Sequence, residues 1–285
     1  MSRFVPNTPP DTTDLPRLVE LFAGGRAAVL TGAGCSTASG IPDYRGPVTD
    51  KRERSPILYQ EFVKNEEARR RYWARSAVGW PRLRRAEPND GHRALAILEA
   101  VGALSGLITQ NVDGLHQAAG SREVVELHGR LALARCLTCG ARSCRDALQE
   151  WLLGKNPGWG ECCHAAEMAP DGDVEIPEIP ADFRVPACPS CQGVLKPDVV
   201  FFGENVARGV VDEAWGILDA ADFLLVVGSS LTVFSGYRFV RGAKQRGMPV
   251  ALVNIGPTRG DGDADLKVQA PCCQVLTELA EHLSL

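Results

Sequence analysis

The sequence predicts an α/β protein built on a doubly wound, parallel, Rossmann-like sheet that carries a smaller inserted domain. Short apolar runs that suit buried strands alternate with helical patterns, and three of these runs end in turns of small residues. Two other segments interrupt the alternation. A chain of 285 residues is long enough for one large domain with a smaller one attached.

The expected strands are short apolar runs, most of them bounded by Gly, Asp, Asn or Pro. They are residues 27–30, 104–109, 199–202, 223–227 and 250–253. Residues 91–101 and 210–220 lie between such runs and repeat their apolar residues with helical spacing. This alternation indicates a parallel sheet that is covered on both faces.

Both interruptions are predicted to belong to the small domain. The first looks helical and basic, with eleven Lys and Arg against four acidic residues over 51–85, and the second is rich in Cys, Pro and Gly. The Rossmann-like domain is therefore expected to comprise residues 1–50, 89–134 and 194–285, and the insertions residues 51–88 and 135–193.

Two C-x-x-C pairs lie at the ends of the second insertion, Cys136 with Cys139 and Cys188 with Cys191. Two such pairs can surround one tetrahedral zinc ion, and four thiolates leave no open position for catalysis. We therefore predict a zinc ribbon whose single zinc ion is structural and holds the ends of the insertion together. Surface cysteines or a redox pair are the alternative.

Composition excludes several classes of protein. The net charge of −4 opposes general binding to nucleic acid or to an anionic membrane, and no apolar run is long enough to span a bilayer. Ten cysteines without a secretory signal indicate a reducing compartment. We expect a cytoplasmic monomer, or a protein of the mitochondrial matrix if the source is eukaryotic.

Small-residue turns follow three of the predicted strands and predict a nucleotide site. They contain Gly32, Ala33, Gly34 and Ser36 in the first, Gly228, Ser229 and Ser230 in the second, and Asn254 in the third. The first turn lacks the third Gly of the usual dinucleotide fingerprint and is weak evidence alone. Ligands of parallel sheets bind outside the carboxyl ends of the strands, which favours one dinucleotide site over three unrelated turns.

A polar run after the strand 104–109 provides candidate catalytic groups. Gln110, Asn111 and Asp113 offer amides and a carboxylate, and His116 and His128 offer imidazoles. An imidazole titrates near neutral pH and suits a general base. A packing role is an equal alternative for His116.

The order of the motifs resembles that of the sirtuins, over nearly the whole chain. The matching segments are residues 32–36, 39–45, 109–116, 126–129, the two C-x-x-C pairs, 196–204 and 228–231. Residues 71–75, 169–174 and 254–259 resemble the class II, sirtuin-four-like members. The resemblance implies a sirtuin-type, NAD-dependent protein lysine deacylase that releases nicotinamide, deacylated lysine and O-acyl-ADP-ribose.

The resemblance also implies roles for individual residues. It places Asp43, Tyr44 and Arg45 in a mobile loop over the cofactor, Gln110, Asn111 and Asp113 around the nicotinamide and its ribose, and Ser229, Asn254 and Cys273 along the adenosine half. His128 is implied as the general base that acts on a ribose hydroxyl, with Asn111 and Asp113 as its catalytic partners. Val200, Phe201, Phe202, Gly203 and Glu204 are implied to pair with the backbone of an acyl-lysine protein substrate.

Tyr72 and Arg75 form a Y-x-x-R pair that, in one sirtuin lineage, binds acidic acyl groups. Residues three apart share one face of a helix, and Arg can bind a carboxylate through two hydrogen bonds. We therefore predict a preference for glutaryl or hydroxymethylglutaryl groups over acetyl. The alternative is a packing Tyr and a solvent-facing Arg.

An acidic stretch, residues 161–182, contains seven carboxylates and no Lys or Arg. We hypothesise that it docks on the basic segment 51–85 and narrows the acyl channel, while a solvated, flexible loop is an equal alternative.

Two other functions stay open at this point. A protein ADP-ribosyltransferase would share the NAD pocket. A non-catalytic zinc ribbon that binds nucleic acid is opposed by the acidic balance and by the few aromatic residues of the basic segment.

Overall fold

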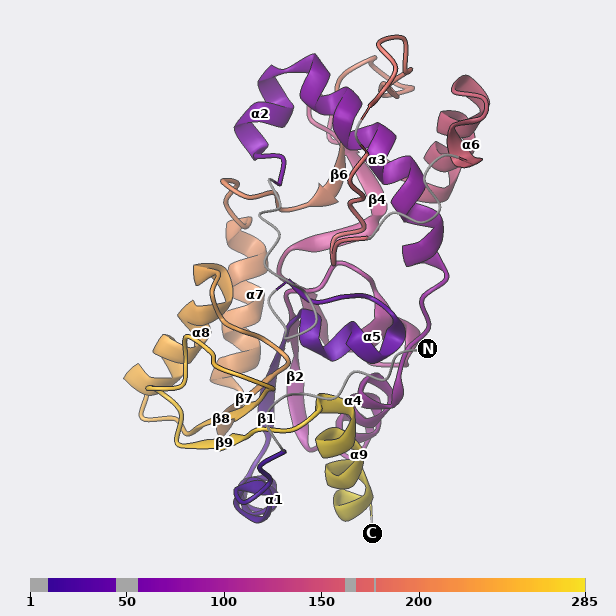
Figure 1. Ribbon diagram of the computed structural model, residues 1–285. Helices are drawn as coiled ribbons and strands as arrows, with labels where there is room; N and C mark the ends of the chain where they lie inside the picture. The colour runs from indigo at the N-terminus through magenta and orange to yellow at the C-terminus, as the bar shows by residue number, and fades with distance from the viewer. Residues whose placement is uncertain (1–9, 45–55, 162–167, 177, 285) are drawn as a thin grey trace.

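A parallel sheet forms the centre of the larger lobe of the computed structural model, which describes residues 10–44, 56–161, 168–176 and 178–284 (Figure 1). Within these residues the sheet has six strands in the order β3-β2-β1-β7-β8-β9. They are β1 (Ala27–Thr31), β2 (Leu104–Thr109), β3 (Val124–Glu126), β7 (Phe223–Val227), β8 (Val250–Val253) and β9 (Leu266–Val268). Every pairing between them is parallel.

The strand order creates a switch point beside β1. The chain first extends the sheet from β1 to β2 and β3, and later returns to the other side of β1 with β7, β8 and β9. Connections on the two sides then diverge, and a crevice opens at the carboxyl ends of β1 and β7. The turns after Thr31 and Val227 therefore lie side by side at this edge of the sheet.

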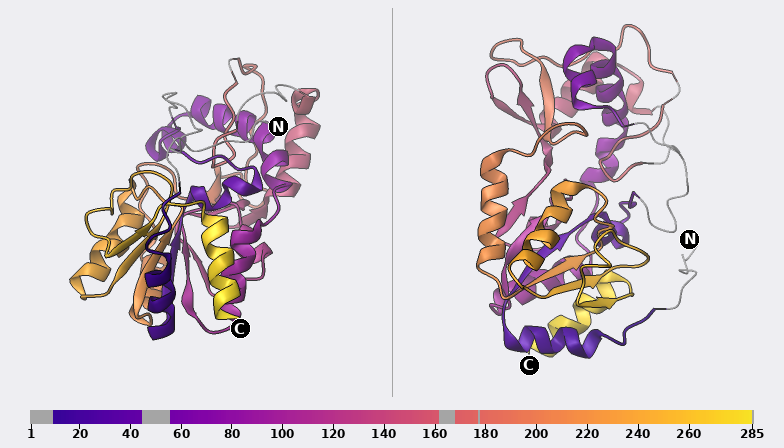
Figure 2. Two further views of the ribbon diagram at one scale, coloured as in Figure 1. Left: turned by 60° about the horizontal axis from the view of Figure 1, so that its bottom comes forward. Right: turned by 90° about the vertical axis from the view of Figure 1, so that its left-hand side faces the viewer.

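Helices cover both faces of this sheet, as the two views in Figure 2 show. One face packs on α1 (Leu15–Gly24), α4 (Asp90–Ala100) and α9 (Cys272–Leu283), and the other on α7 (Arg208–Asp219) and α8 (Phe234–Gln245). Successive residues of β1 point to opposite faces of the sheet. Val29 packs in the core with α1, α4 and α9, Leu30 packs in the core with α7 and α8, and both are fully buried. The predicted doubly wound, Rossmann-like sheet is confirmed.

A smaller lobe is built on β4 (Gly129–Cys136), β5 (Arg142–Cys144) and β6 (Leu195–Val199). In the described chain these form an antiparallel three-stranded sheet with β4 in the centre. Helices α3 (Glu66–Arg84) and α6 (Arg145–Lys155) pack beside it around Trp73, Leu152 and Phe183. Helix α2 (Tyr59–Lys64) packs on α3 through Phe62. Short helices η1 (Ala33–Ser39), α5 (Leu115–Ala118) and η2 (Trp159–Glu161) complete the chain.

The predicted strand at 199–202 is wrong. The strand of this region is β6, which ends at Val199, and Val200, Phe201 and Phe202 follow it without regular structure. Val200, Phe201 and Phe202 line a cavity instead of a sheet core, so the apolar run reflects the wall of this cavity. Segments 129–134 and 195–199, which we assigned to the Rossmann-like domain, contribute strands to the small sheet; the domain boundaries stay a prediction.

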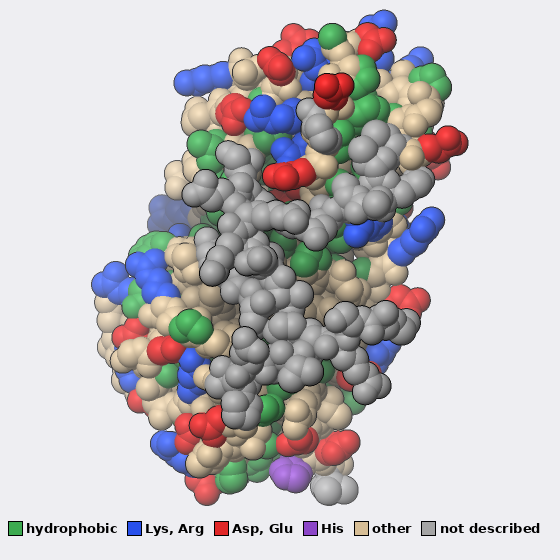
Figure 3. All heavy atoms as spheres, viewed as in Figure 1, with side chains coloured by type: hydrophobic (Ala, Val, Ile, Leu, Met, Phe, Trp, Pro, Cys, Tyr) green, Lys and Arg blue, Asp and Glu red, His purple; other side chains and the backbone are tan. Residues whose placement is uncertain are grey.

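Acidic and basic side chains are interspersed on the face shown in Figure 3. None of the helices in the described ranges has the length and hydropathy needed to cross a bilayer.

Candidate active site

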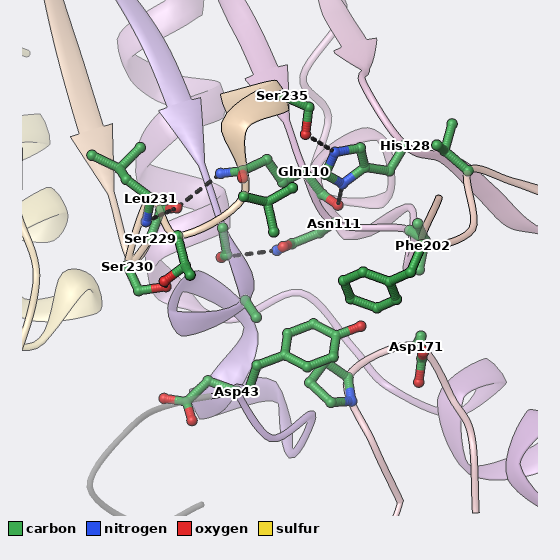
Figure 4. Close-up of a pocket in the computed structure, with 18 of the residues that line it drawn as sticks. Asp43, Gln110, Asn111, His128, Asp171, Phe202, Ser229, Ser230, Leu231 and Ser235 are labelled. Carbon is green, nitrogen blue, oxygen red and sulfur yellow. Dashed lines mark hydrogen bonds between the residues drawn. The ribbon is translucent and has the colours of Figure 1, made fainter. Parts of the chain in front are cut away.

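A cavity of about 960 Å³ lies at the carboxyl ends of β1 and β7, where residues of both lobes meet. Most of the predicted site residues line it, and Figure 4 shows how several of them face one another. The lining members are Gly32, Ala33, Gly34, Ser36, Asp43, Tyr44, Tyr72, Gln110, Asn111, Asp113, His128, Val200, Phe201, Phe202, Gly203, Glu204, Gly228, Ser229, Ser230 and Asn254.

Close backbone packing holds the first two turns together. The Gly32 N–H donates to the Val227 carbonyl over 3.0 Å, and the Gly34 N–H donates to the Gly228 carbonyl over 2.8 Å. Gly228 has a φ of +59°, and a Cβ there would lie 2.4 Å from the Cys35 nitrogen. These glycines are therefore required for the approach of β1 to β7, and the Gly32 and Gly34 amides are used inside the protein.

A polar network follows β2 and reaches back to η1. The Ser36 hydroxyl donates to Asp113 Oδ2 over 2.7 Å, and Asn111 Nδ2 donates to Ser36 Oγ over 3.1 Å. The Leu115 N–H holds the other carboxylate oxygen of Asp113 at 2.9 Å. Burial raises the pKa of Asp113 above its ordinary value. The network fixes an amide and a carboxylate on one wall of the cavity.

His128 stands on an adjacent wall, held between Gln110 and Ser235 (Figure 4). Its Nδ1 lies 2.9 Å from the Gln110 carbonyl oxygen, which can only accept, so Nδ1 carries the proton. Nε2 therefore holds the lone pair and accepts from the Ser235 hydroxyl at 2.7 Å. Burial lowers the pKa of His128, so the neutral imidazole is the resident form near neutral pH. This is the state that a general base requires.

Gln110 links this wall to the second turn. Its side-chain Nε2 donates to Ser229 Oγ over 2.8 Å, while its backbone carbonyl accepts the hydrogen bond from His128 Nδ1–H. Gln110, the residue that directly follows β2, thereby positions both the His128 imidazole and the turn after β7.

Two of the residues predicted to bind NAD or substrate, Cys273 and Arg75, do not line the cavity. Cys273 Sγ lies 3.3 Å from Oδ1 of Asn89, the N-cap residue of α4, and Arg75 binds the Asp173 carboxylate and the Val174 carbonyl. Arg45 lies outside the described residues. Tyr72 does line the cavity, so the structure separates the members of the Y-x-x-R pair.

A buried lysine that the prediction missed supports the segment 200–204. The Lys196 ammonium donates to the carbonyls of Pro197 and Val199 and lies 3.0 Å from Glu204 Oε2. The same carboxylate oxygen accepts from the Phe201 N–H at 2.9 Å. The Val200 N–H donates to the His128 carbonyl over 2.8 Å, which ties the segment to the imidazole. Only the folded chain shows this role, because a lone Lys carries no sequence signal.

The two C-x-x-C pairs meet as predicted. Cys136 Sγ lies 3.5 Å from Cys191 Sγ, and Cys139 Sγ lies 3.7 Å from Cys188 Sγ. These distances are close to the roughly 3.8 Å edge of a tetrahedron with Zn–S bonds of about 2.3 Å. Hydrogen bonds from the Cys139 and Thr138 amides lower the pKa of Cys136 to about 6. The donor set fits a structural zinc ion and no open coordination position remains.

A second cluster, of Cys35, His92 and His116, lies behind the polar network and does not line the cavity. The Asn89 N–H donates to His92 Nδ1 over 3.3 Å, and His116 Nε2 lies 2.9 Å from Thr31 Oγ1. Burial lowers the pKa of His116 to about 3. These contacts favour the packing role that was left open for His116.

Comparison with known proteins relates the chain to one protein family and to bacterial relatives that share half of its residues. Residues 32–235 match the model of the Sir2 family. A protein of Xanthomonas campestris pv. campestris (strain 8004), named NAD-dependent protein deacetylase, is 53% identical over 257 residues, which cover 90% of this chain and 87% of the relative. NAD-dependent protein deacetylase 1 of Mycobacterium avium (strain 104) is 52% identical over 94% of this chain and 95% of its own.

Solved structures show the same fold. The complex of Sir2 with a p53 peptide and NAD+ superposes with a TM-score of 0.74 at 30% identity, over 94% of this chain and 98% of the other. A Sir2 homologue in complex with NAD superposes with a TM-score of 0.71 at 31% identity, over 94% and 93% of the two chains.

Proposed function

The chain belongs to the Sir2 family, and from that membership we propose that it is an NAD-dependent protein deacetylase acting on acetyl-lysine. Relatives that cover nine-tenths of the chain bear that name. The observation that carries the proposal is the neutral His128, whose lone pair on Nε2 faces Ser235 at the wall of a cavity formed by the glycine turns of β1 and β7.

NAD is a substrate in this proposal, and the cavity has two chemically different ends. Ser229, Ser230 and Asn254 come from turns that suit the adenosine half, and Asn111 and Asp113 suit the nicotinamide ribose. Asp43 and Tyr44 line the cavity beside them and would close over the dinucleotide, as would Arg45 beyond the described residues.

The proposed chemistry uses the acyl oxygen as nucleophile. The bond between nicotinamide and ribose breaks, the acetyl oxygen bonds to the ribose carbon that is left electron-poor, and His128 takes a proton from a ribose hydroxyl. That hydroxyl attacks the acyl carbon, and water completes the release of lysine and O-acetyl-ADP-ribose. Buried Asn111 and Asp113 are fixed before the reaction, so they need not reorganise as charge develops.

Protein substrates would bind along residues 200–204. This segment has no partner strand on the side that faces the cavity in the described chain, and Phe202 is 40% exposed. An extended substrate can add to such a segment by backbone hydrogen bonds. A zinc ion on the four cysteines would stabilise the small lobe and take no part in the chemistry.

Finer predictions from the sequence remain predictions. They are the class II, sirtuin-four-like assignment, the cytoplasmic location and the monomeric state. The sequence also predicted a preference for glutaryl and hydroxymethylglutaryl groups, which the comparisons do not support and which requires the Arg75 guanidinium to reach the substrate. In the structure that guanidinium is bound to Asp173.

The test is turnover of an acetyl-lysine peptide with NAD, followed by mass spectrometry. We expect equal amounts of nicotinamide, free lysine peptide and O-acetyl-ADP-ribose, and a loss of about 10²–10⁴-fold in kcat for His128→Ala. His116→Ala is the matched control, since that imidazole does not line the cavity. NAD cleavage with label appearing on protein, and no O-acetyl-ADP-ribose, would support the ADP-ribosyltransferase instead.

A further inference from the structure

The strap, defined as residues 168–176, lies along helix α3 of the small lobe. Val174 is fully buried and packs in one cluster with Val78 and Leu83 of α3. Gly172 approaches Gly79 so closely that a Cβ on Gly79 would lie 1.8 Å from the Gly172 carbonyl oxygen. Apolar contact and backbone packing therefore place the strap at this position.

The strap places an internal carboxylate on Arg75. Arg75 Nη2 lies 2.9 Å from Asp173 Oδ2, with side-chain exposures of only 11% and 19%. Arg75 Nε donates to the Val174 carbonyl over 2.8 Å, so two of the three guanidinium nitrogens are bound to the strap. Burial raises the pKa of Asp173 to about 6, although Arg75 acts to lower it. Near neutral pH the pair is an ionised salt bridge.

Asp173 lines the cavity and Arg75 does not. The wall around Asp173 is otherwise largely apolar, with Tyr72, Ile57 and Phe201, and it includes a second carboxylate, Asp171. Figure 4 shows Asp171 and Phe202 at the end of the pocket opposite Ser229 and Ser230. An acyl chain that extends toward Tyr72 therefore meets apolar side chains and carboxylates, with the arginine behind them.

We propose that Asp173 is a specificity-determining residue that occupies Arg75, so that the cavity accepts uncharged acyl groups and disfavours acyl groups that end in a carboxylate. The inference rests on the proposed deacylase function and names its substrate class. A glutaryl carboxylate would have to displace Asp173 from the guanidinium or remain unpaired beside the two partly buried carboxylates of Asp171 and Asp173, and both are unfavourable. Discrimination thus comes from a repulsive group against the wrong substrate.

The test is to remove the Asp173 carboxylate, so that the Arg75 guanidinium loses its salt-bridge partner. In Asp173→Ser the carboxylate is removed and space opens beside the guanidinium, whereas Asp173→Asn removes the charge and keeps the shape. We expect the ratio of kcat/KM for a glutaryl-lysine peptide to that for an acetyl-lysine peptide to rise about tenfold or more in Asp173→Ser, and less in Asp173→Asn. The double variant Asp173→Ser/Arg75→Gln should lose the gain.

Two measurements keep the result interpretable. Glu61→Gln is the matched control, because Glu61 of α2 forms a salt bridge with Arg71 of α3 and neither residue lines the cavity. It should leave the ratio unchanged. Equilibrium binding of both peptides is measured beside turnover, with melting temperatures to confirm folding. If the wild-type protein turns over neither peptide, the proposed function is wrong. The ratio of the binding affinities for the glutaryl-lysine and acetyl-lysine peptides still tests whether Asp173 sets specificity. An unchanged binding ratio in both folded Asp173 variants, or a gain that persists without Arg75, overturns the inference.

Discussion

His128 shows how single contacts set the chemistry of a side chain. Its protonation state follows from an acceptor on one nitrogen and a hydroxyl on the other, because the Gln110 carbonyl cannot donate. Burial is the largest influence on its pKa and disfavours the charged form, and the nearby Arg238 guanidinium lowers that pKa further. The hydrogen bond to Gln110 acts in the opposite direction.

These contacts predict the pH dependence. Only neutral His128 can accept a proton, so kcat/KM for NAD should fall as the pH drops through its pKa. Because that pKa is lowered, the acid limb should have its midpoint below 6.5, the ordinary value for imidazole. In Arg238→Gln one positive charge is removed, the imidazolium becomes easier to form, and the midpoint should move upward. The measurement is the pH profile of kcat/KM.

Arg241→Gln is the control for this profile, because Arg241 is an exposed arginine on the same helix. It should leave the midpoint in place. A midpoint above 6.5 in the wild type, or equal shifts in both variants, would show that another group limits the rate.

At the scale of elements, α3 combines a basic sequence with a buried face. Asn65 caps its N-terminus by accepting from the Glu67 and Ala68 amides, and Trp73 and Ala77 are buried against the small sheet. The strap covers another part of the same helix through Gly79. We hypothesised from the sequence that the acidic stretch 161–182 docks on the basic segment 51–85 by attraction between opposite charges. The described part of the contact is mainly apolar, with the Arg75–Asp173 pair buried inside it.

This packing predicts that two Gly→Ala substitutions change the free energy of unfolding in opposite directions. In Gly79→Ala the new methyl group would overlap the Gly172 carbonyl, which is backbone and cannot turn aside. The clash should cost about 1–3 kcal/mol of unfolding free energy, more than the roughly 1 kcal/mol that Ala gains over Gly in a helix. Thermal unfolding should show a lower Tm.

Gly216→Ala is the matched substitution in α7, where a Cβ meets nothing within 4 Å. It should raise stability by about 0.5–1 kcal/mol. A rise in Tm for both variants would mean that the strap moves away from α3 without cost.

At the scale of the molecule, the two lobes divide the work. The parallel sheet supplies the glycine turns and the polar network, whereas the small lobe supplies Tyr72, the strap and the segment 200–204 that follows β6. The cysteine pairs lie at the end of β4 and just before β6, which pair with each other. A zinc ion there would hold the strands that lead into the substrate segment.

Metal removal should therefore affect the lobes unequally. We expect one zinc per chain and, after chelation or in Cys136→Ser, loss of the metal with a lower Tm. Amide hydrogen exchange should accelerate in β4, β5 and β6 and stay slow in β1 and β7, because the metal's binding energy contributes to folding of the small lobe. Deacetylation should fall with it and return when zinc is restored.

The corresponding control is Cys144→Ser, which removes an exposed thiol outside the cluster. It should retain zinc and activity. An equal acceleration of amide hydrogen exchange in both lobes after chelation would contradict a stabilising effect of zinc that is confined to the small lobe.

Much of this architecture could be predicted because its signals are local. Apolar runs with the right boundaries identified β1, β2, β7 and β8, and the C-x-x-C spacing identified the metal ligands. The run 199–202 misled the prediction because apolar residues that line a cavity look like those of a strand. The assignment of Arg75 to the cavity followed the resemblance to one sirtuin lineage and helical spacing. Helical spacing places two residues on one face and says nothing of what packs there.

The sequence by itself determined the alternating fold, the zinc ligands and the kinds of group around the cavity, because each depends on residues close together in the chain. Only the tertiary structure decided which groups meet. Ser235 contacts His128 across 107 positions, Lys196 supports the segment 200–204 from within a strand, and Asp173 binds Arg75 from a separate insertion. Such contacts depend on how distant elements pack, and packing leaves no periodic or spaced pattern in the sequence.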